Sequence, residues 1–309
     1  MTFIFFNRHG LIRSGWKILI FVVLAAGLVY GVTASVRLLD PWVQEMDLGR
    51  LVGVIVPVLA LGGVLLASYV STRWLNRKPF AAVGLWLHPR AASEVLLGIL
   101  LGFLMMAFIF VALLATGNIS IEIRSIDAGD LLVILLSSGV TFAAAAMLEE
   151  VVFRGYPFQT LIQGITLLPA VILMAVLFSL AHLANPNTTI FGIVNIGLAA
   201  IWLSFAYLKT KGLWLPFGLH FGWNFSQTTV FAFPTSGIEF AEYKLFGTVV
   251  TGPEWLTGGA FGPEGGALAT VTLIVCTVYV LKAKQFDAVD GMITLDTLED
   301  LEIEQERLP

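Results

Sequence analysis

Residues 93–116 read SEVLLGILLGFLMMAFIFVALLAT, an apolar run in which Glu94 is the single ionisable side chain. A helix needs about 20 mostly apolar residues to cross the hydrocarbon core of a bilayer. The run is continuous rather than alternating, which favours a helix and excludes the strands of a membrane barrel. This stretch therefore predicts a transmembrane helix, and comparable stretches recur along the chain.

The composition of the whole chain agrees with a membrane protein. Of its 309 residues, 58% are hydrophobic and 12% are charged, whereas a soluble domain carries about 25% charged residues. No basic patch or stripe indicates a nucleic-acid partner. The single cysteine, Cys276, excludes a disulfide framework. We therefore expect an integral membrane protein whose surroundings are the lipid bilayer.

Eight stretches are long and apolar enough to span a bilayer, so we expect an all-α, polytopic bundle of about eight transmembrane helices. The apolar part of the first stretch is longer than the roughly 7–15 residues of a signal-peptide core, so we expect it to remain uncleaved. The expected helices are Trp16–Val36, Leu51–Thr72, Ser93–Thr116, Leu131–Leu161, Leu167–Leu183, Thr189–Leu208, Leu213–Phe233 and Ala267–Leu281.

Lysine and arginine concentrate in the connections that fall on one side of eight crossings. The connections on the other side, 40–50, 118–130 and 234–266, lean acidic. Cytoplasmic loops carry the excess of positive charge, so both termini are predicted to be cytoplasmic, in a multi-pass protein of the plasma membrane. The basic residues concerned are Arg8, Arg13, Lys17, Arg73, Arg77, Lys78, Arg90, Lys209, Lys211, Lys282 and Lys284.

Two segments are expected to stand outside the bundle. Residues 252–266, GPEWLTGGAFGPEGG, are rich in glycine and proline and predict a loop. Residues 285–309 are acidic and predict a solvated tail, with a short amphipathic helix as the alternative because leucines recur at near-helical spacing. We therefore divide the chain into one membrane domain, 1–284, and an acidic cytoplasmic tail, 285–309.

The first group of charged residues at membrane depth is Glu149, Glu150 and Arg154. Such residues cost about 2.5–3.5 kcal/mol each on insertion scales, so they are expected to face the protein interior. Glu150 and Arg154 are four residues apart and can pair on one helix face. Glu149 points about 100° away, which leaves it able to face a cavity. The alternative is a buried ion pair that only fixes the position of the helix.

The second group is Phe178 and His182, which share a face near the end of the fifth expected helix. With Gly164 as the turn, Glu150 and His182 lie about 21 and about 27 Å along two antiparallel helices. Glu150 and His182 are therefore expected at similar depths in the membrane, which indicates one shared site. The alternative is a histidine that only forms a packing hydrogen bond.

The third group is His220 and Asn224, which lie four residues apart on the seventh expected helix. Their polar groups project toward one point. Gly218 and Gly222 would let a neighbouring helix approach closely beside them. The alternative is a hydrogen-bond clamp between helices, worth about 0.6–2 kcal/mol.

The three motifs together, Glu-Glu-x-x-x-Arg, Phe-x-x-x-His and His-x-x-x-Asn, resemble those of the CPBP family, also called ABI. This family includes the CAAX prenyl endopeptidases of the Ras-converting type. The motifs occur in the family's order on three successive apolar regions, and the likeness covers residues 142–226. The resemblance implies an intramembrane endopeptidase with its protease core at about 131–233.

The resemblance also implies roles for the motif residues. Glu149 and His182 would activate a water molecule, with Glu149 as the general base. His220 and Asn224 would donate hydrogen bonds to the developing oxyanion. The expected substrate is a membrane-embedded or lipidated peptide or protein, and no cofactor is expected. The residues expected to support the site are Glu150, Arg154 and Phe178.

Other interpretations stay open at this point. Glu149, His182 and His220 could instead hold a zinc ion with an open position for water. We favour the glutamate mechanism, because His-Glu-x-x-His is absent and the candidate ligands lie on three separate segments. A non-catalytic scaffold or bacteriocin-immunity-type protein could keep the same residues. A transporter would more often show inverted repeats, and no such symmetry is visible.

Overall fold

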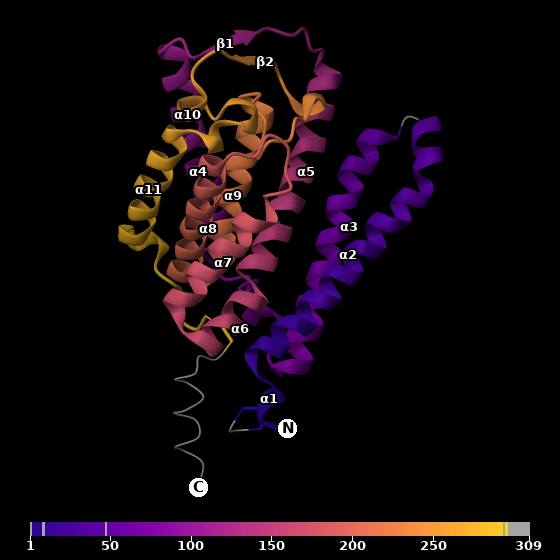
Figure 1. Cartoon of the computed structure of the whole chain (residues 1–309), viewed down its shortest axis with the longest axis vertical. Coiled ribbons are helices and arrows are strands. Elements are labelled where there is room, and N and C mark those ends of the chain that lie inside the picture. Colours follow the sequence, from indigo (N-terminus) through magenta and orange to yellow (C-terminus); the bar gives the residue numbers. More distant parts are fainter. Residues whose placement is uncertain (1, 8–9, 47, 293, 296–309) are drawn as a thin grey trace.

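The computed structural model of the chain describes residues 2–7, 10–46, 48–292 and 294–295. Its main feature is a bundle of helices, with a hairpin of two long helices at one side (Figure 1). The hairpin consists of α2 (Ser14–Glu45) and α3 (Gly49–Val70), and α3 packs against α5. Toward one end of the molecule the hairpin splays away from the bundle (Figure 1).

The bundle itself contains seven larger helices among the described residues, together with short elements. The short elements include the helix α10 (Glu254–Thr257) and one antiparallel pair of strands, β1 (Ile119–Glu122) and β2 (Gly247–Val250). The short helix α1 (Thr2–Phe5) lies instead at the start of the hairpin, where Trp16 Nε1 donates to the carbonyl oxygen of Ile4 (Figure 1). The larger helices are α4 (Ala91–Ala115), α5 (Ala128–Phe153), α6 (Tyr156–Ile165), α7 (Leu167–Ala181), α8 (Ile190–Thr210), α9 (Trp214–Phe225) and α11 (Ala267–Lys282).

The helices have the length and surface of a membrane protein. Five helical stretches in the described ranges are long and apolar enough to span a bilayer, and α7 and α11 are shorter apolar helices. Large apolar side chains such as Leu100, Phe108, Leu136 and Val275 are exposed on the outside of the bundle. Exposure of such apolar side chains is favourable in contact with lipid tails and unfavourable in contact with water. The predicted all-α, polytopic membrane bundle is confirmed; the count of eight crossings stays a prediction.

The fourth expected helix, Leu131–Leu161, is wrong as a single element, because the chain breaks after Phe153. Pro157 lies in the first turn of α6, where its missing N–H costs nothing, whereas inside a longer helix it would remove a hydrogen bond. The turn expected at Gly164 lies instead at Thr166, whose φ is 72°. Arg154 is thereby placed at the end of a helix, from which its side chain can cross to a neighbour.

Residues 252–266 do not stand outside the bundle, so that expectation is wrong. They form α10 and two short 3₁₀ turns, and Phe261 is fully buried. The side chain of Asn195, on α8, donates hydrogen bonds to the carbonyl oxygens of Glu264 (2.7 Å) and Gly266 (3.0 Å). Thr270 Oγ1 donates to Asn195 Oδ1 at 2.7 Å. These contacts fasten the segment across the ends of α8 and α11.

The start of the acidic tail packs on the bundle within the described part of the chain. Phe286 and Leu295 are buried, and the N–H of Leu295 donates to Gln159 Oε1 at 3.0 Å. The amphipathic helix considered for the leucines that follow falls outside the described residues. The tail therefore begins as a segment that crosses the end of the bundle and reaches α6.

Close packing of α9 on α4 determines where the third motif lies. A Cβ atom added at Gly218 or Gly222 would come well under 3.0 Å from backbone carbonyl oxygens of α4. Gly98 and Gly102 on α4 meet the backbone of α9 in the same way. Small residues allow two backbones to approach this closely, as the sequence predicts for Gly218 and Gly222. The position of α9 relative to α4 is therefore set by direct backbone contact.

Candidate active site

One cavity of about 380 Å³ inside the bundle collects residues from all three motifs. Glu149 on α5, His182 at the end of α7, and His220 and Asn224 on α9 all line it. Glu150 and Arg154 do not line the cavity and lie behind its wall. The structure thus brings together side chains that the sequence holds more than 70 positions apart.

Glu150 and Arg154 form the ion pair that their spacing predicts. The Nη1 atom of Arg154 lies 3.1 Å from Glu150 Oε1, and the side chains of Arg154 and Glu150 are 1% and 0% exposed. The Nη2 atom of Arg154 also donates to the carbonyl oxygen of Ala200 on α8, at 3.1 Å. Arg154 can reach α8 because α5 ends one residue before it. The pair therefore ties the end of α5 to α8.

His220 contacts both glutamates of the first motif. Its Nδ1 atom lies 2.8 Å from Glu150 Oε1, and its Nε2 atom lies 3.8 Å from Glu149 Oε2. Glu150, as a carboxylate paired with Arg154, accepts this hydrogen bond, so Nδ1 carries the proton. The interaction holds the imidazole plane, and it directs Nε2 toward Glu149 and the cavity.

Glu149 is the less buried of the two glutamates, with its side chain 29% exposed. Its Oε2 atom is nevertheless buried, and it has no hydrogen-bond partner among the described residues. A buried polar oxygen without a partner is uncommon in proteins and marks a place for water or a ligand. Glu149 therefore offers a free acceptor beside the cavity.

His182 directly follows α7, and its ring is oriented by the backbone. Its Nδ1 atom lies 2.8 Å from the carbonyl oxygen of Phe178. A carbonyl oxygen can only accept, so Nδ1 carries the proton and Nε2 of the neutral ring is left as an acceptor. The carbon Cζ of Arg154 lies 4.7 Å from the centre of the Phe178 ring, in a cation–π contact. The ring centre of Phe178 is also 4.7 Å from that of His182. Phe178 thereby connects the first and second motifs.

Asn224 lies one helical turn beyond His220 and is partly buried. Its side chain lines the cavity, and in the described part of the chain no hydrogen bond to its amide group is present. An amide nitrogen in this position can donate to a ligand in the cavity. His220 and Asn224 thus present their polar groups from the same face of α9.

Glu264 is a cavity residue that the sequence analysis did not identify. It lies in the 252–266 segment, and its carboxylate is buried. Glu264 Oε2 accepts hydrogen bonds from the N–H (2.6 Å) and Oγ (2.9 Å) of Ser236, and Oε1 accepts from Trp223 Nε1 (3.3 Å). Burial raises the pKa of the Glu264 carboxyl, and the hydrogen bonds from Ser236 offset part of that rise.

The remaining wall of the cavity is mainly apolar and aromatic. Substrate sites are commonly lined by such side chains, with a few polar groups that orient the ligand. This lining suits an apolar peptide segment in a membrane. The wall residues of this kind include Phe142, Phe153, Ile196, Trp202, Leu203, Phe240 and Leu273.

A zinc ion would need a set of ligands that converge on one point. His220 Nε2 and Glu149 Oε2, 3.8 Å apart, could face one ion. Across the described ranges, however, no three or more His, Cys, Asp or Glu groups are arranged to hold a metal. The contact of the other nitrogen of His220 with Glu150 does not count against zinc, because zinc-binding histidines commonly donate their second nitrogen to a carboxylate. The donor set therefore fits zinc only in part, and the choice between glutamate and zinc stays a prediction.

The family model described as "Type II CAAX prenyl endopeptidase Rce1-like" matches residues 131–226, a segment that holds all three motifs and ends before Glu264. No curated protein and no solved structure matches the chain. The family match supports a CAAX-type intramembrane protease in general. Residues 131–226 of this chain are therefore similar to the Rce1-like type II CAAX prenyl endopeptidases, in agreement with the family that the three motifs resemble.

Proposed function

We propose that this protein is an intramembrane endopeptidase that hydrolyses a peptide bond of a membrane-associated substrate. The observation that carries the proposal is the meeting of Glu149, His182, His220 and Asn224 in one cavity of the bundle. The family match gives independent support for a protease with a membrane-associated substrate. The cavity is lined mainly by apolar side chains, which suits a substrate segment that comes from lipid.

The attacking water would lie between Glu149 and His182. Glu149 Oε2 has an unused acceptor site, and the neutral His182 ring keeps Nε2 as an acceptor because Nδ1 is bonded to a backbone carbonyl. Glu149 would take a proton as the water oxygen attacks the scissile carbonyl carbon. It would then return that proton to the leaving amine. Positioned acid–base groups of this kind contribute about 10²–10⁴-fold to a rate.

The oxyanion formed in this step would accept hydrogen bonds from His220 and Asn224. His220 already donates from Nδ1 to Glu150, so donation from Nε2 requires a ring that carries both protons. The carboxylates of Glu149 and Glu150 flank the ring and would stabilise its positive charge. Asn224 would donate from its amide nitrogen. A preorganised donor of this kind is worth about 10²–10³-fold in kcat.

The zinc-dependent version of the same protease remains the alternative mechanism. Glu149, His182 and His220 would then be the ligands, and the same cavity would serve. We favour the glutamate mechanism, because Glu149, His182 and His220 are not grouped closely enough to hold one metal ion. The two mechanisms differ in what a chelator does to the activity.

The proposal is tested with protein purified in detergent and a library of fluorogenic membrane peptides. Wild type, Glu149→Gln and His182→Ala are compared, each with and without a strong chelator. Glu122→Gln, which changes an exposed carboxylate on β1, is the matched control. We expect cleavage by wild type and the control, loss in both site variants, and no effect of the chelator.

Each other outcome has a definite meaning. Activity that the chelator abolishes and zinc restores would replace the glutamate mechanism with the metal mechanism on the same residues. Activity that survives Glu149→Gln would refute the assigned base. A folded wild type that cleaves no peptide would favour a non-catalytic scaffold or immunity-type protein, or a transporter.

A further inference from the structure

A second hollow, of about 270 Å³, lies at the end of the hairpin and shares no lining residue with the cavity of the candidate active site. The start of α2, the chain that follows α3 and the helix α6 contribute to its wall. Figure 1 shows these segments together at the end of the molecule that holds α1. We call it the hairpin hollow. Its polar and aromatic lining residues are Lys17, Trp74, Asn76, Arg77, Lys78 and Gln163.

Lys17 is the buried cation of the hairpin hollow. It is 8% exposed and lies in the first turn of α2, which begins at Ser14. Its ammonium group has no hydrogen bond and no ion pair with any described residue. Buried charges in proteins are normally paired, and the positive end of the helix dipole makes a cation in the first turn less favourable still. The surroundings of Lys17 therefore favour a bound anion.

The described residues that line the hairpin hollow supply no such anion, because none of them is an aspartate or a glutamate. They supply further donors instead. Asn76 Oδ1 accepts from the hydroxyl of Tyr156 at 3.0 Å, so the other polar atom of this amide, Nδ2, can only donate. Lys78 adds another cation to the wall. The hollow thus combines positive charge with a neutral donor, and nothing on its described wall balances that charge.

Arg77 brings a guanidinium to the same wall. Its φ is 55°, which is uncommon for a residue with a side chain, and this left-handed turn follows the end of the helical segment Ser71–Leu75. A guanidinium can donate two parallel hydrogen bonds to a phosphate group, which an ammonium cannot do. The combination of Arg77 with Lys17 is therefore typical of a site for a phosphate group.

The hairpin hollow lies where both helices of the hairpin reach the end of their apolar spans. Lys17 is in the first turn of the span Ser14–Glu45, and Trp74 is at the end of the span Gly49–Leu75. Trp74 is 72% exposed, and tryptophan is enriched at the boundary between membrane and water. Ile20, one turn farther into the span, is 42% exposed and suits contact with acyl chains. The hollow is thus at the level of the lipid headgroups.

We propose that the hairpin hollow binds the phosphate group of an anionic phospholipid headgroup. Lys17 would balance the charge of the phosphate, Arg77 would bind two of its oxygens, and Asn76 would donate one further hydrogen bond. The volume is below the roughly 300–1,000 Å³ of sites for drug-sized ligands, which suits a headgroup phosphate. Inorganic phosphate has the same chemistry, but the position at the bilayer surface favours the lipid. Binding of this lipid does not depend on any peptidase activity.

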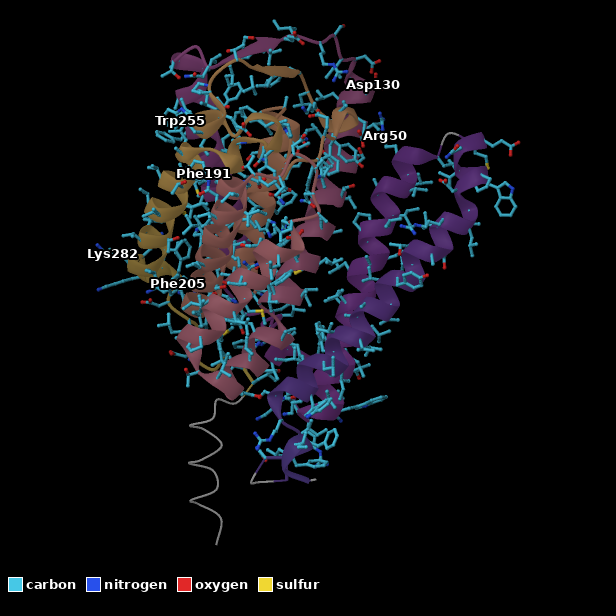
Figure 2. All side chains as sticks on the ribbon, in the orientation of Figure 1. Arg50, Asp130, Phe191, Phe205, Trp255 and Lys282 are labelled. Atoms are coloured by element: carbon cyan, nitrogen blue, oxygen red, sulfur yellow. The ribbon has the colours of Figure 1, made fainter. Side chains whose placement is uncertain are left out.

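Native mass spectrometry and thermal unfolding of the full-length protein in detergent test this site. Wild type, Lys17→Met and Arg77→Gln are titrated with phosphatidylglycerol. Arg77 is exposed, so Arg77→Gln should fold even if the buried substitution at Lys17 impairs folding. Lys282→Met is the matched control, because it removes an exposed cation of α11, on the side of the bundle away from the hairpin (Figure 2).

We expect wild type and Lys282→Met to retain phosphatidylglycerol and to show a melting temperature that rises with its concentration, because a ligand that binds only the folded state stabilises it. Lys17→Met and Arg77→Gln should each bind at least about fivefold more weakly, the effect of losing one basic residue near an anionic lipid. Phosphatidylcholine, whose headgroup has no net charge, should give a smaller rise in melting temperature for wild type.

Three results would overturn the proposed site. Equal weakening in Lys282→Met and Lys17→Met would assign the binding to general surface charge. Inorganic phosphate that raises the melting temperature as much as phosphatidylglycerol, at matched ionic strength, would refute the lipid as the ligand. A full-length variant with the acidic residues between 296 and 306 changed to Asn and Gln provides the last test. Binding that depends on Lys17 only in this variant would show that the acidic tail, and not a lipid, occupies the hollow.

Discussion

The Nδ1 atom of His220 lies 2.8 Å from Oε1 of Glu150, a residue 70 positions earlier in the chain. The same carboxylate oxygen accepts from Arg154 Nη1 at 3.1 Å. One buried oxygen thus holds both the arginine of the first motif and the histidine of the third. Glu150 is therefore a positioning residue for the imidazole as well as the partner of a buried charge.

Removal of the charge at position 150 is expected to destabilise the protein and impair the site. Glu150→Gln leaves the guanidinium of Arg154 buried without a counter-charge, and breaking a buried pair in this way costs about 3–5 kcal/mol. The free energy of unfolding in detergent and kcat/KM are measured together. The double variant Glu150→Gln, Arg154→Met removes both charges and should regain stability but not activity. Recovery of both would show that Glu150 acts only through Arg154.

Asn224→Ala is expected to lower kcat about 10²–10³-fold with little change in KM, because a preorganised oxyanion donor acts mainly in the transition state. Asn224 is only partly buried and has no hydrogen-bond partner in the described structure, so the melting temperature should change little. Steady-state kinetics with the best peptide of the library measure the two constants. A rise in KM at unchanged kcat would instead assign Asn224 to substrate binding.

Glu264→Gln is expected to change how stability depends on pH. The pKa of Glu264 is raised by burial above its ordinary value of 4.5. A group whose folded-state pKa is raised contributes stability below the unfolded pKa and loses it as pH rises through the folded pKa. The wild type should therefore lose stability relative to Glu264→Gln as the pH rises from the ordinary carboxyl pKa of 4.5 through the raised pKa of the folded protein.

Melting temperatures of the two proteins across that pH range measure the difference, and other titrating groups cancel in the comparison. Glu254→Gln, which changes an exposed carboxylate of the same segment, serves as the control and should follow the wild type. A constant difference between wild type and Glu264→Gln at every pH would contradict a raised pKa at this position.

Gly222→Ala is expected to destabilise the bundle and reduce activity. The new methyl group would meet the α4 backbone at a distance that real Cβ atoms do not show, so α9 must shift and carry His220 and Asn224 with it. Overpacking of this kind costs about 1–3 kcal/mol. Gly139→Ala on α5, where an added Cβ has no neighbour within 4 Å, is the matched control. Unfolding in detergent and peptide cleavage are measured for both, and equal behaviour would refute the close-contact role of Gly222.

Several features of this protein follow from local sequence. The apolar stretches identify membrane helices, because the free energy of transferring about 20 residues into lipid depends on the composition of those residues. The pairing of Glu150 with Arg154 and the shared face of His220 and Asn224 follow from the helical repeat, which places residues four apart side by side. The order of the three motifs on successive apolar segments indicates the family that matches residues 131–226.

Other features were decided only by tertiary structure, because they depend on segments far apart in the chain. The contact of His220 with Glu150 requires α9 to pack beside α5, and the glycine contacts with α4 set the position of α9. Glu264 reaches the cavity because hydrogen bonds from Asn195 and Ser236 hold its segment over the bundle. The glycine- and proline-rich composition of that segment predicts only a loop. Local sequence thus specifies which side chains are chemically available, whereas the packing of the helices specifies which of them meet in the cavity.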